Sequence, residues 1–251
     1  MNRPATLFVG ALRQRLRREL RDVAPGRRLR LQLGVAAVEE YARGRGPLRL
    51  LDAGSEEGLL CLRLAQRHPE WCLVAADLAE EPLLRGRGWA LEEGLAVHHV
   101  RCDLTRPLGD DVYDAVVALE SLAEIPDDRA ALRQMVSALR PGGLLVAQVP
   151  TDGWTPVLRG AERTWRREAR HGYDADGLLR LLEELDLTVH QLRPTFRRLT
   201  ALAQDVRDRL KHRGRGTRLL LLPVMAAVVR LERLGVGWGP ARGWFVVATK
   251  A

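Results

Sequence analysis

Glycines and carboxylates recur where the predicted strands of this chain end. An apolar strand over residues 48–52 ends in Asp52 and is followed by a turn that contains Gly54 and Gly58. Glycines in such a turn let the backbone approach a ligand and leave N–H groups free beside it. The next predicted strand ends in Asp77, nineteen residues beyond Gly58. A nucleotide-binding sheet presents a carboxylate to a ribose at this place, so the spacing predicts a ribose-containing ligand.

Alternating strand and helix patterns predict the framework that positions these residues. Strands are expected at residues 48–52, 71–77, 95–102, 114–119, 144–149, 188–192 and 244–249. Helices are expected at residues 8–23, 29–42, 59–67 and 127–139, in an acidic stretch ending at 93, at 176–185, and twice between 195 and 236. This alternation predicts an α/β fold with a doubly wound, mostly parallel sheet. Asp103 closes the third strand and Glu120 follows the fourth, so both are expected at the sheet edge that carries Asp52.

Four segments resemble, in the same order, the motifs of class I S-adenosylmethionine-dependent methyltransferases. They are residues 51–58 (LDAGSEEG), 113–122, 125–127 and 139–143 (LRPGG). The resemblance runs through residues 47–150. It implies S-adenosylmethionine as the cofactor and a Rossmann-like sheet. It also implies that the sixth and seventh strands form an antiparallel pair closing that sheet, with the last strand antiparallel to the others.

The resemblance places the first glycine turn at the methionine end of the cofactor. Asp52, Gly54 and Gly58 are expected to border the methionine part, and Asp77 to bind the ribose hydroxyls. One position departs from the family pattern, because Glu56 stands where the family usually has a middle glycine. Its side chain must point away from the cofactor. This departure leaves a non-catalytic, cofactor-binding protein as an alternative.

The resemblance places the third and fourth strand ends at the adenine and at the reacting methyl. Asp103 with Leu104 is expected to flank the adenine. Leu119 and Glu120 are expected to line the pocket near the methyl group. Because methyl transfer is an in-line displacement, the protein mainly aligns the acceptor and excludes water. A general base matters where the acceptor atom arrives protonated.

Candidates for the acceptor side lie in residues 151–175, which follow the fifth strand. Glu120, His171 and Tyr173 are the catalytic candidates, and Glu120 is preferred because a motif places it there. His171 is also interpreted as an exposed loop histidine, and Tyr173 as packing against the following helix. Residues 98–99, both histidines within a predicted strand, are interpreted as core or surface residues.

The charge distribution is uneven. Residues 1–46 carry a net charge of +7, residues 47–150 carry −7 and residues 151–251 carry +8. The acidic middle suits a sulfonium cofactor, and the basic ends suit an anionic partner or solvated helix faces. The basic ends leave an RNA methyltransferase as an alternative. We do not expect nucleic acid, because aromatic residues make up 5% of the chain and no RNA-binding module is recognisable.

The motifs also exclude several reaction classes. The fourth strand is followed by Glu120 and Ser121 rather than by the Asn/Asp-Pro-Pro-aromatic motif of adenine and glutamine methyltransferases. No cysteine stands in the Pro-Cys context of cytosine-C5 enzymes, and the glycine spacing differs from that of dehydrogenases. The expected function is therefore methyl transfer to an oxygen, nitrogen or sulfur atom of a small-molecule or lipid-linked acceptor.

Cysteine use and the N-terminus favour a cytoplasmic protein. Cys61, Cys72 and Cys102 lie in apolar runs without metal-ligand spacing, which predicts three buried thiols, no disulfide framework and no metal site. No secretory signal and no apolar stretch of membrane-spanning length is visible.

The domain organisation is expected to be one cofactor-binding domain with two helical additions. Residues 1–46 form an N-terminal extension and residues 47–251 the methyltransferase domain, with a helical insertion at residues 195–241. Within it, residues 197–236 combine arginines with an apolar run. Three interpretations remain open for this segment: a lid over the acceptor pocket, a homodimer contact, or a basic amphipathic pair on an anionic membrane.

Overall fold

The computed structural model describes residues 24–152, 157–158, 172–210 and 215–251, without the side chains of residues 215–222. These residues form two compact units. The helical unit contains residues 24–29, 157–158, 196–210 and 215–239. The sheet unit contains residues 30–152, 172–195 and 240–251. The helix predicted at residues 8–23 lies outside the described residues.

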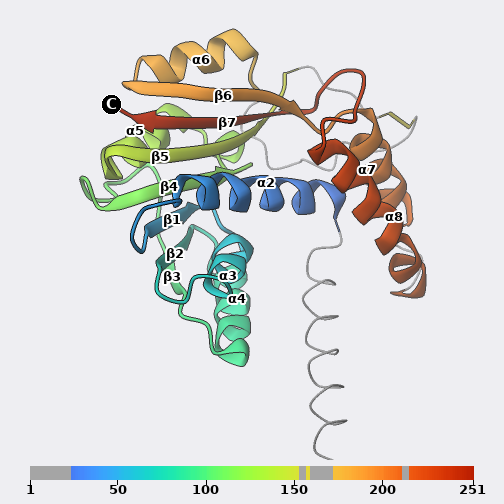
Figure 1. Cartoon of the computed structure of the whole chain (residues 1–251), viewed down its shortest axis with the longest axis horizontal. Helices are drawn as coiled ribbons and strands as arrows, with labels where there is room; N and C mark the ends of the chain where they lie inside the picture. The colour runs from blue at the N-terminus through green and yellow to red at the C-terminus, as the bar shows by residue number, and fades with distance from the viewer. Residues whose placement is uncertain (1–23, 153–156, 159–171, 211–214) are drawn as a thin grey trace, which may run out of the picture. The chain divides into compact units, whose positions relative to one another are not determined.

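A seven-stranded sheet forms the centre of the sheet unit. Its strands are β1 (Arg49–Ala53), β2 (Cys72–Asp77), β3 (His98–Arg101), β4 (Tyr113–Leu119), β5 (Leu139–Pro150), β6 (Leu187–Thr195) and β7 (Gly243–Lys250). The order across the sheet is β3-β2-β1-β4-β5-β7-β6, which can be followed in Figure 1 from the lowest strand to the highest. The first five strands are parallel to one another, and β7 is antiparallel to both β5 and β6. The predicted Rossmann-like α/β fold with an antiparallel last strand is thus confirmed.

Helices connect the strands and cover the sheet. They are α2 (Pro25–Tyr41), α3 (Leu59–Ala65), α4 (Glu80–Glu93), the short 3-10 helix η1 (Leu122–Glu124), α5 (Asp128–Ala138) and α6 (Ala175–Glu183). Alternate strand residues such as Leu51 and Val116 pack with Met135 of α5 and Leu182 of α6 in one hydrophobic cluster. Because side chains alternate along a strand, their neighbours face the opposite side of the sheet, where α3 and α4 contact β2. The predicted insertion holds α7 (Arg198–Leu210) and α8 (Arg215–Arg233).

Several element boundaries differ from the sequence expectation. α2 begins at Pro25, four residues before its predicted start, because proline fits the first turn of a helix, where its missing N–H is not needed. β3 is shorter than expected, since α4 ends at the left-handed Gly94 and leaves residues 95–97 as a connection. β5 begins at Leu139, which was expected to end a helix, and its pairing with β4 is irregular near that end.

The expectation of three buried thiols is wrong for two of the cysteines. All three are free thiols, and Cys61 is fully buried in α3. Cys72 begins β2 and Cys102 follows the edge strand β3, and both are partly exposed. Cys72 precedes the part of β2 that pairs with β3, and Cys102 lies beyond the end of β3, so each lacks a paired strand on one side, which an apolar sequence context does not reveal.

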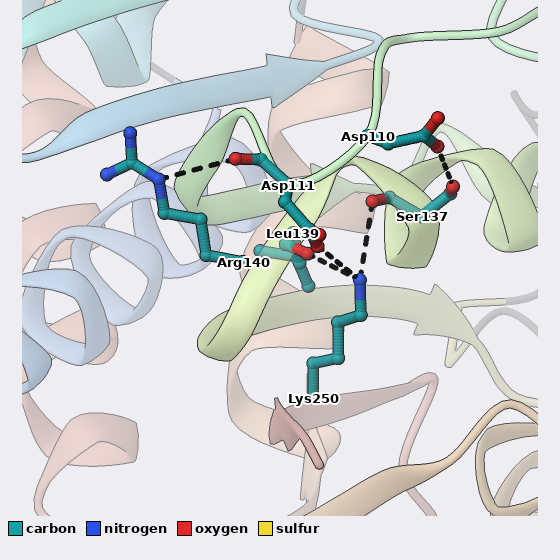
Figure 2. Close-up of polar contacts among 6 residues, drawn as sticks. All are labelled: Asp110, Asp111, Ser137, Leu139, Arg140 and Lys250. Atoms are coloured by element: carbon teal, nitrogen blue, oxygen red, sulfur yellow. Dashed lines mark hydrogen bonds and ion pairs between the residues drawn. The ribbon is translucent and has the colours of Figure 1, made fainter.

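The amino-terminal edge of the sheet is fastened by Lys250 at the end of β7. Its Nζ donates to Oδ1 of Asp111 at 2.8 Å and to the carbonyl oxygens of Leu139 at 2.6 Å and Ser137 at 3.4 Å (Figure 2). The two carbonyls stand at the carboxyl end of α5, where helix carbonyls lack intrahelical partners and favour a cation. Lys250 therefore joins the last strand, the end of α5 and the loop before β4.

Candidate active site

The glycine turn between β1 and α3 is packed against the strands on either side of β1. Gly54 donates its N–H to the carbonyl of Ala76 on β2 at 2.8 Å. Gly54 and Gly58 have φ values of 77° and 69°, in the left-handed region that favours glycine. A Cβ added at Gly54 would lie 2.2 Å from Cβ of Ser121, and one at Gly58 would lie 2.8 Å from Cβ of Ala75. Packing within the protein therefore already requires glycine at both positions.

Asp77 is oriented by two backbone amides at the end of β2. Its Oδ2 accepts a hydrogen bond from the N–H of Glu56 at 2.8 Å, and its Oδ1 accepts one from Ala79 at 2.9 Å. The carboxylate is thus tied to the glycine turn and remains partly exposed. Each carboxylate oxygen can accept more than one hydrogen bond, so this arrangement retains acceptors for a pair of hydroxyls. A ribose offers such a pair of hydroxyl donors, so the carboxylate of Asp77 suits a ribose.

Asp52 lies at the end of β1, close enough to Asp77 for the charge of Asp77 to affect its pKa. Its side chain is buried, and burial raises its pKa to about 8, with the negative charges of Asp77 and Glu56 adding to the shift. Glu56 itself is exposed and adopts a left-handed φ of 49°. A positively charged ligand at this edge would favour the ionised form of Asp52. The carboxyl groups of Asp52 and Asp77 therefore fit a ligand that combines a positive charge with ribose hydroxyls.

The end of β3 contributes one exposed carboxylate and one core side chain. Asp103 accepts hydrogen bonds from Oγ1 of Thr105 at 2.7 Å and from its N–H at 2.9 Å. These bonds lower the pKa of Asp103, with a smaller contribution from Arg106. Leu104 is buried in the hydrophobic cluster beneath the sheet edge. Among the described residues, no group of His, Cys, Asp and Glu side chains has the arrangement of a metal site.

The end of β4 brings Glu120 to the same edge of the sheet. Glu120 follows Leu119, has a buried side chain and adopts a left-handed φ of 71°. Its N–H donates to the carbonyl of Gln148 on β5 at 2.7 Å, and Ser121 Oγ donates to the carbonyl of Ala53 at 2.7 Å. Non-glycine residues in this conformation persist where surrounding contacts fix them, and they are common at functional sites.

Of the other two catalytic candidates, Tyr173 is described by the structure and His171 is not. His171 lies outside the described residues. Tyr173 is buried, and its hydroxyl donates to Oδ2 of Asp128 at 2.5 Å. Its carbonyl accepts a hydrogen bond from Nε1 of Trp244 at 3.1 Å. These contacts join Tyr173 to α5 and β7, a geometry that favours the packing role over the catalytic one.

Three residues that pack at the turn were given no part in the site by the sequence analysis, which interpreted His99 only as a core or surface residue. Ser121 packs on Gly54, as described above. The ring of His99 lies beneath the turn, since Cβ atoms added at Gly58 and Gly86 would lie 3.2 and 2.8 Å from its Nε2. Burial lowers the pKa of His99. A signal existed for Gly86, because glycine inside a helix is costly and indicates close packing, here against the carbonyl of Glu57.

Comparison with known proteins agrees with this geometry. Residues 12–192 match the family model described as a methyltransferase domain. A ubiquinone biosynthesis O-methyltransferase from Idiomarina loihiensis is 33% identical over 109 residues, 42% of this chain and 44% of the relative. The protein of the same name from Pectobacterium carotovorum is 26% identical over 158 residues, 61% of this chain and 64% of the relative. The chain thus aligns with less than two thirds of the length of these curated relatives.

A solved structure shares the fold. The geranyl diphosphate C-methyltransferase of Streptomyces coelicolor, in complex with Mg2+, geranyl diphosphate and S-adenosyl-L-homocysteine, superposes with a TM-score of 0.60 at 16% identity. The superposition covers 88% of this chain and 79% of that one. The family match spans well over half of the chain. The chain therefore belongs to the methyltransferase domain family, in agreement with the class I methyltransferases that its sequence motifs resemble.

Proposed function

We propose that this chain transfers the methyl group of S-adenosylmethionine to a small-molecule acceptor, at an oxygen, nitrogen or sulfur atom. The observation that carries the proposal is the acidic edge at the glycine turn, where buried Asp52 stands beside Asp77. When bound, the cofactor supplies an electrophilic methyl group on a cationic sulfonium. The carboxylates complement that charge, and Asp77 presents its remaining acceptor capacity to the ribose hydroxyls.

The other strand ends complete the proposed site. Asp103 and Leu104 are proposed to flank the adenine, and Leu119 and Glu120 to face the acceptor. Glu120 is a buried carboxylate fixed by its backbone hydrogen bond to β5. It can accept a proton if the acceptor atom arrives protonated, as a hydroxyl does. Because two relatives are named for O-methylation in ubiquinone biosynthesis, a quinone-type acceptor is the class we favour.

Titration calorimetry with S-adenosylmethionine tests the cofactor site. We expect Asp77→Ala to weaken binding at least tenfold, because charge-assisted hydrogen bonds contribute about 1.5–3 kcal/mol. The matched control is Asp111→Ala, which removes a carboxylate at the opposite edge of the sheet, where it pairs with Lys250. Equal affinities of Asp77→Ala and the unsubstituted chain would remove Asp77 from the site.

Release of S-adenosylhomocysteine tests the reaction. The chain is incubated with the cofactor and a panel of hydroxylated aromatic and quinol acceptors, and we expect release with at least one of them. Glu120→Gln should lower the turnover while leaving cofactor affinity within about twofold. Cofactor binding without release on the panel or on a cell extract would contradict the enzymatic proposal and favour the non-catalytic alternative.

A further inference from the structure

An apolar stripe is exposed on α8 and the turn that follows it. The stripe consists of Val224, Leu231, Leu234, Val236 and Trp238, and all five side chains are exposed. Leu234 is 72% exposed and Trp238 is 55% exposed. Val224 and Leu231 lie seven residues apart, on the same face of the helix, and exposed Ala227 lies between them. Exposed large apolar side chains that share a face mark interaction surfaces more often than scattered ones do.

The opposite face of α8 is the one that packs within the helical unit. Met225 and Val229 are buried there. Glu232 is buried as well; it accepts a hydrogen bond from the N–H of Arg197 at 3.1 Å and one from Oγ1 of Thr200. The core contacts of α8 are thus made by a different face from the one that carries Val224 and Leu231.

Backbone contacts hold the end of the stripe in place. The N–H of Val236 donates to the carbonyl of Leu231 at 3.0 Å, and the carbonyl of Trp238 accepts a hydrogen bond from Arg198 at 3.2 Å. Nη1 of Arg197 donates to the carbonyl of Gly237 at 2.9 Å. The turn is therefore folded back onto the start of α7, while the Trp238 side chain remains exposed.

The charges exposed around the stripe are positive. Among the residues of the helical unit whose side chains are described, four arginines are exposed: Arg198, Arg209, Arg230 and Arg233. The acids of the same residues are Asp205, Asp208 and Glu232, and none is exposed. Asp205 is buried and accepts the N–H groups of residues 157 and 158. Asp205 and Glu232 are buried and Asp208 is only partly exposed, so the fully exposed charges of these residues are cationic and lie on the same unit as the apolar stripe.

We propose that this stripe with its arginines binds the surface of a membrane that contains anionic lipids. An apolar helix face inserts among the acyl chains while flanking arginines contact the headgroups, and tryptophan favours this interface. Among the described residues, no helix is long and apolar enough to cross a membrane. A nucleic acid would use the arginines and leave the aliphatic side chains in water. Residues 1–23, with six arginines and two acids, share the sign of the surface and do not complement it.

Sedimentation of the full chain with vesicles tests this proposal. We expect binding to vesicles that contain phosphatidylglycerol, weaker binding at high salt, and little binding to pure phosphatidylcholine. Leu234→Ser/Trp238→Ser should weaken binding at least tenfold. The matched control, Leu84→Ser/Leu91→Ser, removes two leucines of α4 that are 58% and 75% exposed, and should leave binding unchanged.

The arginines are tested in the same assay. Arg230→Gln/Arg233→Gln should weaken binding about thirtyfold at low salt, at about fivefold per arginine. Arg133→Gln/Arg180→Gln, on α5 and α6, is the control for charge alone. Calorimetry with S-adenosylmethionine should give the same affinity for all variants. A loss of vesicle binding can therefore be distinguished from a failure of the proposed methyl transfer.

Three results would overturn the proposal. The first is no vesicle binding at low salt, or binding that the Leu234 and Trp238 substitutions leave intact. The second is a dimer in light scattering that those substitutions dissociate, with no vesicle binding, which would assign the stripe to a second copy of the chain. The third is RNA binding lost with the arginines alone, again without vesicle binding.

Discussion

The two edges of the sheet treat their carboxylates differently. At the amino-terminal edge, Asp114 pairs with Nη1 of Arg140 at 2.6 Å and Asp111 pairs with Lys250 at 2.8 Å. At the carboxyl-terminal edge, Asp77 is held by backbone amides, and Asp52 is buried with its pKa raised to about 8. One edge pairs its acids with cations of the chain, whereas the other holds Asp77 by backbone amides and buries Asp52 in its protonated form beside a glycine turn.

The difference in how the carboxylates are held indicates which edge is stabilised by its side chains and which edge is destabilised in a way that a bound ligand could offset. Paired charges at the amino-terminal edge join β4, β5, β7 and α5, which is a structural role. The burial of Asp52 close to the negative charges of Asp77 and Glu56 costs free energy in the folded chain, because it raises the pKa of Asp52 to about 8. Such costs persist where a ligand compensates them, so the comparison itself points to the carboxyl-terminal edge as the site.

The largest expected effect is that of Gly54→Ala at the carboxyl-terminal edge. We expect a loss of about 3 kcal/mol or more in the free energy of unfolding, from the left-handed φ and from the clash with Ser121. Gly44→Ala is the matched control, because Gly44 has a similar φ of 73° and nothing within 4 Å of an added Cβ. Chemical denaturation should show about 1 kcal/mol for the control. Equal losses would mean that the turn has room for a side chain.

The strand ends of the site were predictable because parallel strands make them periodic. Apolar runs that end in Asp52, Asp77 and Asp103 were sufficient to place these residues at one edge, and the structure has them there. The ends of helices and strands were less predictable where the same residue type can either end one element or lie within the next. Pro25 can follow one helix or open another, and Gly142 can end a helix or stand within β5 at φ 71°.

The packing beneath the turn was not predictable from the sequence. His99 lies against Gly58 and Gly86, and Ser121 lies against Gly54, through contacts between residues far apart in the chain. No local pattern encodes such a contact. Gly86 and Gly88 illustrate this, because both lie within α4, yet a Cβ at Gly88 would meet nothing within 4 Å, whereas one at Gly86 would lie 2.0 Å from the carbonyl oxygen of Glu57. A glycine in a helix therefore suggests close packing without showing which glycine is needed.

A second, smaller effect concerns the pH dependence of stability. The folded chain keeps the Asp52 proton up to about pH 8, whereas the unfolded chain releases it near the ordinary value of 3.8. The folded state thus binds more protons between these values, so the free energy of unfolding falls as pH rises. Asp52→Asn should remove about 2 kcal/mol of this fall between pH 6 and pH 8.

Denaturation midpoints across that pH range measure the effect. Asp103→Asn is the control, because hydrogen bonds lower the pKa of Asp103 and its contribution is lost only in acid. Its profile between pH 6 and pH 8 should match that of the unsubstituted chain. If Asp52→Asn retains the full slope, the buried carboxylate does not hold a proton, and the contrast between the two edges weakens.

The smallest effect is expected from Lys250→Met at the amino-terminal edge. The substitution removes the donor to Asp111 and to the two carbonyls at the end of α5 while retaining an unbranched side chain that is one atom shorter. We expect a loss of about 1 kcal/mol, because Asp111 is half exposed and partly exposed ion pairs contribute little. The loss should shrink in high salt, whereas affinity for S-adenosylmethionine should change less than twofold. A tenfold loss of affinity would mean that β7 couples the two edges, and the division between a structural edge and a binding edge would no longer hold.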